Sequence, residues 1–211
     1  GPLPVQPPHV PTPAISSHVV RESWTGEPSY HTLSEVPNIQ PRGMLFLAHG
    51  CGCSARDWWP PSDQCPNCTG LPVERRIVQA ALARGLAVVA ISAMGTCWSP
   101  TDVEPVVALL ARFREQLQIP MEAPTVALGA SSGGSLVTML GNHVVARVVV
   151  QIAPPASLDL AAHPPALFIH MPRDHMTAKV IQQAVDSMRH HGIEAEVRTC
   201  APKPVTPATL E

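Results

Sequence analysis

The sequence predicts one α/β domain, built on a doubly wound, mostly parallel sheet of about eight strands. Continuous apolar runs, such as residues 43–50 and 86–92, lack the alternation of a half-exposed strand and are typical of strands covered on both faces. Helix-compatible segments separate these runs, and strand–helix alternation indicates βαβ units in a parallel sheet. The chain of 211 residues is long enough for one domain with a full core.

The first two strands are expected to form a hairpin at the sheet edge. Residues 17–24 and 29–36 flank the turn-forming segment Gly26-Glu27-Pro28, which fits an antiparallel pair. The remaining strands are expected at 43–50, 86–92, 125–128, 144–152, 165–171 and 193–199. Helices are expected at 73–84, 102–117, 132–140 and 178–190. The sequence shows no lid between the late strands, so we expect a shallow, open site.

The two ends of the chain differ from its middle in composition. Residues 1–16 are expected to form a Pro-rich arm or linker, residues 17–200 the folded domain, and residues 201–211 a Pro-rich tail. The net charge of −2, without a basic block, argues against a nucleic-acid partner. No apolar run approaches the length of about 20 residues that spans a bilayer, so no membrane span is expected.

Residues 126–137 contain the pattern that is most informative about function. An apolar run leads into G-A-S-S-G at 129–133 and then into a helix-compatible run. This fits the G-x-S-x-G nucleophile elbow, in which a strand turns sharply into a helix and presents a serine. Ser131 is preferred to Ser132 at the tip, because it leaves glycine at both crowded positions. The alternative is a glycine-rich turn that only joins a strand to a helix.

Over roughly residues 17–200 the chain resembles the α/β-hydrolase superfamily. The resemblance rests on a buried strand ending in His49-Gly50, the pattern at 129–133, and a late strand that ends at Asp174. Residues 65–75, 91–98 and 129–134 are also similar to a group of uncharacterised algal and plant proteins of this fold. The superfamily resemblance implies a nucleophile at Ser131, oxyanion donors at the N–H groups of Ser132 and Cys51, and an acid at Asp174.

The general base is the missing part of this constellation. In the superfamily the histidine lies after the last strand, and residues 201–211 contain none. His175, next to Asp174, is the best local substitute, whereas His49 is expected to anchor the oxyanion loop. Three interpretations stay open: the chain ends before the histidine, His175 or another residue replaces it, or the fold has lost hydrolysis and kept binding.

We therefore expect a serine hydrolase that cleaves a carboxylic ester or thioester through an acyl-enzyme on Ser131. The expected partner is a small-molecule ester or acyl substrate, and no cofactor or metal is expected. The alternative is a catalytically inactive protein of the same fold that binds a small molecule or a protein in the same cleft. Position 174 has its own alternative, because an aspartate there also fits a turn or the cap of the following helix.

The cysteines predict cross-links near the same rim of the sheet. Four lie in the long loop at 51–72, namely Cys51, Cys53, Cys65 and Cys68. Disulfides, free thiols and a Cys₄ zinc site all remain open for them. One bridge is expected to tie this loop to Cys97, which follows the adjacent strand at the same rim. Disulfides need an oxidising compartment, which favours the secretory pathway or the extracellular space.

Overall fold

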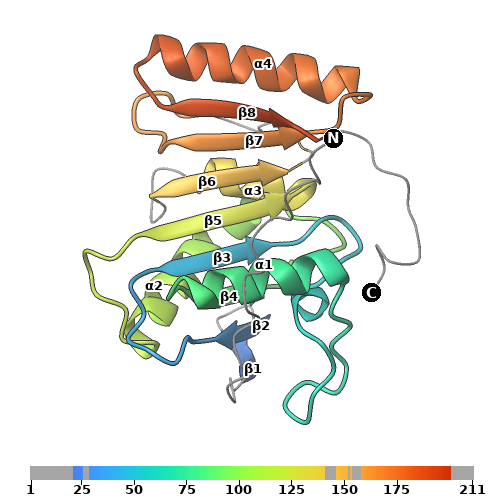
Figure 1. Ribbon diagram of the computed structural model, residues 1–211, viewed down its shortest axis with the longest axis vertical. Coiled ribbons are helices and arrows are strands. Elements are labelled where there is room, and N and C mark those ends of the chain that lie inside the picture. Colours follow the sequence, from blue (N-terminus) through green and yellow to red (C-terminus); the bar gives the residue numbers. More distant parts are fainter. Residues whose placement is uncertain (1–20, 26–28, 141–145, 152, 154–157, 201–211) are drawn as a thin grey trace, which may run out of the picture.

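The computed structural model describes residues 21–25, 29–140, 146–151, 153 and 158–200. Its strands form one eight-stranded sheet in the order β1-β2-β4-β3-β5-β6-β7-β8 (Figure 1). β1 pairs with β2, and β2 with β4, in antiparallel fashion, and the other neighbours are parallel. The predicted α/β sheet is therefore confirmed, together with its edge hairpin. The turn of that hairpin and residues 17–20 lie outside the described residues.

The elements follow the expected order, with small shifts at their ends. The strands are β1 Arg21–Thr25, β2 Tyr30–Glu35, β3 Met44–Ala48, β4 Ala87–Ile91, β5 Thr125–Ala130, β6 Arg147–Gln151, β7 Ala166–His170 and β8 Ala195–Thr199. The α-helices are α1 Pro72–Ala83, α2 Val103–Gln116, α3 Ser132–Met139 and α4 His175–His190, and two 3₁₀ helices are η1 Ala55–Trp58 and η2 Pro100–Asp102. Helix α4 begins earlier than expected, because Asp174 caps it.

Helices cover both faces of the sheet, with α1 on one side and α2, α3 and α4 on the other (Figure 1). Strand β3 shows why its sequence does not alternate. Phe46 packs into the core under α2 and α3, whereas Leu45 and Leu47 pack on the α1 side, and all three are buried. None of the helices in the described part of the chain combines the length and apolar character that crossing a bilayer requires.

The long loop at 51–72 is a compact unit rather than a structureless segment. Ser54 and Asp57 form a reciprocal capping box around η1. Trp59 is buried, and its Nε1 donates a 2.6 Å hydrogen bond to the buried carboxylate of Glu35. Trp58 is buried in the same cluster beside β2, β4 and α1. The loop therefore packs against the α1 side of the sheet.

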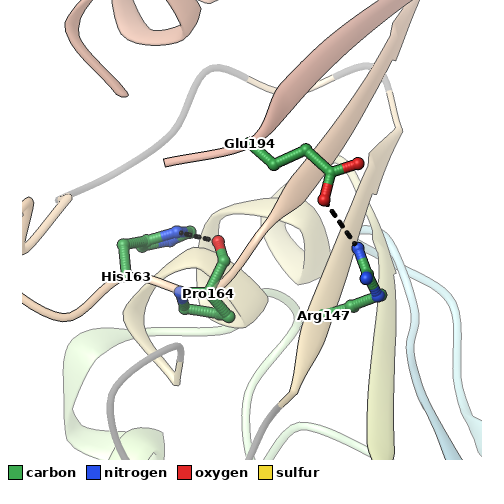
Figure 2. Close-up of polar contacts among 4 residues, drawn as sticks. All are labelled: Arg147, His163, Pro164 and Glu194. Carbon is green, nitrogen blue, oxygen red and sulfur yellow. Dashed lines mark hydrogen bonds and ion pairs between the residues drawn. The ribbon is translucent and has the colours of Figure 1, made fainter. Parts of the chain in front are cut away.

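A buried histidine just before β7 contacts the end of α3. The ring of His163 contacts the carbonyl oxygen of Pro164 through Nδ1 (Figure 2). This distance is 2.8 Å, and Nε2 lies 3.2 Å from the carbonyl oxygen of Thr138. Thr138 is in the last turn of α3. On the surface nearby, Arg147 pairs with Glu194 at 3.3 Å (Figure 2).

Candidate active site

Ser131 occupies the turn between β5 and α3, at the carboxyl edge of the sheet. Its backbone has φ 51° and ψ −120°, a region that non-glycine residues rarely adopt and that costs about 1–3 kcal/mol. The side chain is exposed and, although Ser131 stands at the N-cap position of α3, it makes no capping hydrogen bond. Its hydroxyl group is therefore accessible to a substrate.

The glycines on either side of Ser131 allow three backbone segments to approach closely. A Cβ atom on Gly129 would lie 2.0 Å from the carbonyl oxygen of Gly133. A Cβ atom on Gly133 would lie 2.2 Å from the carbonyl oxygen of Ala48, at the end of β3. The two crowded positions are thus Gly129 and Gly133, the two glycines that flank Ser131 in the G-x-S-x-G pattern.

The loop that carries the predicted oxyanion donor Cys51 passes beside Ser131, and the second predicted donor, Ser132, follows Ser131 directly. A Cβ atom on Gly50 would lie 3.4 Å from Cβ of Ser131, so the loop after β3 passes next to the serine. Ser132 is the first residue of α3, and an N–H group at this position has no acceptor within the helix. The N-terminal end of the helix dipole also favours negative charge here. Cys51 follows Gly50 directly and is bonded to Cys97.

His49 anchors the loop after β3 through hydrogen bonds, as expected from its position. Its Nε2 accepts a 2.9 Å hydrogen bond from the N–H of Ala93, so Nδ1 carries the ring proton and donates to the carbonyl oxygen of Gly50 at 2.7 Å. Burial lowers the pKa of His49, although the bond to Gly50 and the charges of Asp57 and Asp102 oppose this. The imidazole is therefore held neutral in a single tautomer.

Trp98 lies in the site, and its hydrogen bonds there could not be predicted from the sequence. Its Nε1 donates a 3.0 Å hydrogen bond to the carbonyl oxygen of His49, and its backbone N–H donates to Oγ of Ser132 at 3.4 Å. The indole is buried against the ring of His49. The only sequence signal nearby is the S-x-x-D pattern of Ser99 and Asp102, which forms the capping box of η2.

Asp174 and His175 lie on the same edge of the sheet, at the start of α4. The carboxylate of Asp174 accepts a 3.0 Å hydrogen bond from the N–H of Thr177, which confirms the helix-cap interpretation. The hydrogen bonds from Thr177 lower the pKa of Asp174, and the nearby His170 and His175 add to this. His175 is exposed.

The structure does not join these two residues to Ser131. Among the described residues, no hydrogen bond links Ser131 to a histidine or Asp174 to His175. Strands β5 and β7 flank β6, so their carboxyl ends are about 10 Å apart at the usual spacing of neighbouring strands.

The cysteines form two disulfides, Cys51–Cys97 and Cys65–Cys68. The first is the expected bridge between the long loop and the rim at Cys97, and Cys53 keeps an exposed thiol. The bridges leave too few thiolates for the Cys₄ zinc alternative, and no group of three or more potential ligands gathers within the described part of the chain. Two bridges are compatible with the expected oxidising compartment.

Comparisons with known proteins agree with this architecture. The model of the alpha/beta hydrolase family matches residues 45–205. No curated protein matches the chain by sequence.

Three of the similar solved structures are hydrolases by name. A dienelactone hydrolase from Anabaena variabilis is 19% identical, with a TM-score of 0.61 over 90% of this chain and 92% of that one. Carboxyl esterase 2 from Tuber melanosporum is 12% identical, with a TM-score of 0.62 over 90% and 78%. Thermogutta terrifontis esterase 2, phosphorylated by paraoxon, is 13% identical, with a TM-score of 0.62 over 90% and 85%. These likenesses support the fold, and the family match shows that the chain belongs to the alpha/beta hydrolase family.

Proposed function

We propose that this chain is a serine hydrolase that cleaves a carboxylic ester or thioester through an acyl-enzyme on Ser131. The observation that carries the proposal is the geometry of Ser131. Its exposed side chain makes no capping hydrogen bond, and its backbone has a positive φ beside Gly50. A strained serine at a strand-to-helix turn is the geometry of the nucleophile elbow. The esterases among the structural neighbours support the same class of reaction.

In this mechanism Oγ of Ser131 attacks the carbonyl carbon of the substrate, and the N–H groups of Ser132 and Cys51 bind the oxygen as it becomes negative. Each such donor contributes about 10²–10³ in rate. The hydroxyl proton passes to His175, which Asp174 orients. Catalytic hydrogen bonds are often long in an unoccupied site and tighten when substrate binds, so His175 remains our proposed base.

The second candidate is a protein that binds an acyl compound or a protein segment at this edge without cleaving it. Two observations favour it: among the described residues no histidine bonds Ser131, and the carboxylate of Asp174 is engaged by Thr177. Because triad members act as a unit, a serine without its base would retain little catalysis.

Labelling with a fluorophosphonate probe separates these functions. We expect the probe to label the wild-type chain and short activated esters to be hydrolysed, and both signals to be lost in Ser131→Ala. Ser187→Ala is the matched control, since it removes an exposed serine hydroxyl on α4, away from the sheet edge. His175→Gln should lower kcat by about 10²–10⁴ if the ring is the base.

Each outcome has a definite meaning. Undiminished labelling of Ser131→Ala would assign the nucleophile to another residue. A folded wild-type chain that takes up no probe and hydrolyses no ester would favour the binding protein.

A further inference from the structure

Three segments from separate parts of the chain meet beside Ser131. The loop after β3 contributes residues 49–53, the loop after β4 contributes residues 93–98, and α3 contributes its first residue. We name residues 93–98 the rim clamp, because this segment holds the other two. It is tied to the loop after β3 by four links: Ala93 N–H to His49 Nε2 at 2.9 Å, Gly52 N–H to the Thr96 carbonyl at 2.8 Å, Trp98 Nε1 to the His49 carbonyl at 3.0 Å, and the Cys51–Cys97 disulfide.

The rim clamp also reaches α3, because the backbone N–H of Trp98 donates to Oγ of Ser132 at 3.4 Å. The two backbone groups proposed to bind the oxyanion, those of Cys51 and Ser132, are thus attached to the same six-residue segment. Their separation depends on where the rim clamp lies.

The peptide group between Gly50 and Cys51 is oriented from one side. Its carbonyl oxygen accepts hydrogen bonds from Nδ1 of His49 at 2.7 Å and from the N–H of Cys53 at 3.1 Å. In a trans peptide the following N–H points in the opposite direction, away from these two donors. Within the described part of the chain, no protein acceptor is found for the N–H of Cys51, so it remains available to a substrate oxygen.

We propose that the Cys51–Cys97 disulfide is a positioning cross-link that holds the oxyanion donor of Cys51 in place, so that catalysis at Ser131 depends on the oxidation state of this bridge. The inference rests on the proposed function and names its regulation. The hydrogen bond from Gly52 to Thr96 lies between exposed residues and competes with water, so alone it contributes little net stability. Water does not compete with the covalent S–S bond between Cys51 and Cys97.

The bridge is also open to reagents. Cys51 and Cys97 are both exposed, whereas Cys65 and Cys68 are buried. A dithiol reductant would break the exposed S–S bond by two successive thiolate attacks. The two cysteines gain two electrons and two protons and become thiols, and the dithiol loses the same number and becomes a cyclic disulfide.

Cys53 is a free thiol only two positions from the bridge, and its attack on Cys51 would scramble the cross-link. Partial burial raises the pKa of Cys53, and the carboxylates of Asp57 and Glu74 raise it further. The thiol is therefore mostly protonated near neutral pH and is a slow nucleophile. We therefore expect attack of Cys53 on the bridge to be slow.

The test compares the two disulfides in the full chain. We expect kcat on a short activated ester to fall at least about tenfold in Cys51→Ala/Cys97→Ala, and by at most the 10²–10³ of a whole lost donor, because the donor remains but is misplaced. KM should change little, since the interaction is made in the transition state. The matched control, Cys65→Ala/Cys68→Ala, removes the buried bridge and should retain kcat. Treatment of the wild-type chain with dithiothreitol should reproduce the loss, and reoxidation should reverse it.

Amide hydrogen exchange of residues 49–53 gives a readout that does not need activity. Exchange there should accelerate at least about tenfold on reduction and in the Cys51/Cys97 variant, and should stay unchanged in the control. If kcat and this exchange are the same with and without the bridge, the positioning role is overturned. If the oxidised chain takes up no fluorophosphonate but the exchange does accelerate, the proposed hydrolase fails while the cross-link retains its role in holding the loop.

Discussion

The two halves of the candidate site are built in different ways. Around Ser131, three segments distant in sequence are held by the disulfide and by buried hydrogen bonds from His49 and Trp98. Around Asp174, the contacts are local, because its carboxylate accepts a hydrogen bond from Thr177, three residues later in the chain. His175 is exposed. Contacts across the fold therefore fix the geometry of the nucleophile half, around Ser131. A local helix cap fixes the geometry of the acid–base half, at Asp174 and His175.

If the proposed function is correct, this difference indicates which part of the site needs long-range packing. An oxyanion donor acts only if it lies within a few tenths of an ångström of its position, so its loop must be fixed from several sides. A general base is less constrained before substrate binds. The following experiments test this difference between the two halves, beginning with the largest expected effect.

Gly133→Ala tests whether the nucleophile half depends on close backbone approach. The added Cβ would lie 2.2 Å from the carbonyl oxygen of Ala48, so the backbone must shift. We expect the free energy of unfolding in urea to fall by about 3 kcal/mol or more. Gly192→Ala is the comparison: its φ of +75° disfavours alanine, but nothing lies within 4 Å of the new Cβ, so the loss should be about 1 kcal/mol. Equal losses would contradict the crowding argument.

Asp174→Asn tests whether the acid–base half has more than a capping role. Asparagine caps helices about as well as aspartate, so thermal stability should be retained, whereas Asp174→Ala should lower it. If Asp174 orients the base, kcat of the asparagine variant should fall by about 10² or more with the melting temperature unchanged. Full activity in Asp174→Asn would leave this residue as a helix cap alone.

His49 makes the nucleophile half sensitive to pH. Its folded pKa is lowered, so the unfolded chain takes up a proton more readily than the native chain does. The resulting stability is fully present above the unfolded pKa of about 6.5 and is lost as the pH falls through the folded pKa. The urea midpoint of the wild type should therefore fall more between about pH 7.5 and pH 5 than that of His49→Gln. Parallel pH curves would show that protonation of His49 is not coupled to folding.

The Arg147–Glu194 pair tests whether exposed polar contacts matter elsewhere on the surface. The atoms are 3.3 Å apart, and the side chains are 59% and 66% exposed. A double-mutant cycle with Arg147→Ala and Glu194→Ala should give a coupling energy of about 0.2–1 kcal/mol. A coupling above that range would mean that exposed pairs contribute as much as the buried links around Ser131.

The sequence predicted those features that depend on local pattern. The run at Met44–Ala48 lacks alternation because both faces are covered, and the glycines around Ser131 mark a close approach of backbone. The disulfide to Cys97 followed from the adjacency of two strands at one rim.

Other features depend on contacts through space and leave no local pattern. Trp98 donates a hydrogen bond to the carbonyl oxygen of His49, which lies 49 residues earlier in the chain. The sequence around either residue does not indicate this contact. The packing of the loop at 51–72 is not visible in its own sequence, because its partners, such as Glu35, lie in a distant strand. The general base depends on such contacts as well, and His175 is proposed only from its place beside Asp174 at the rim of the sheet.

The Cys51–Cys97 bond spans 46 positions and makes a covalent ring of the chain, enclosing the long loop, α1 and β4. A protease cut anywhere inside that ring leaves both fragments attached, so the nicked molecule migrates as one species until reductant is added. Pro66 and Asn67, the exposed residues of the turn between the buried Cys65 and Cys68, are a natural place for such a cut. Oxidised molecules would thus survive a nick that divides reduced molecules in two.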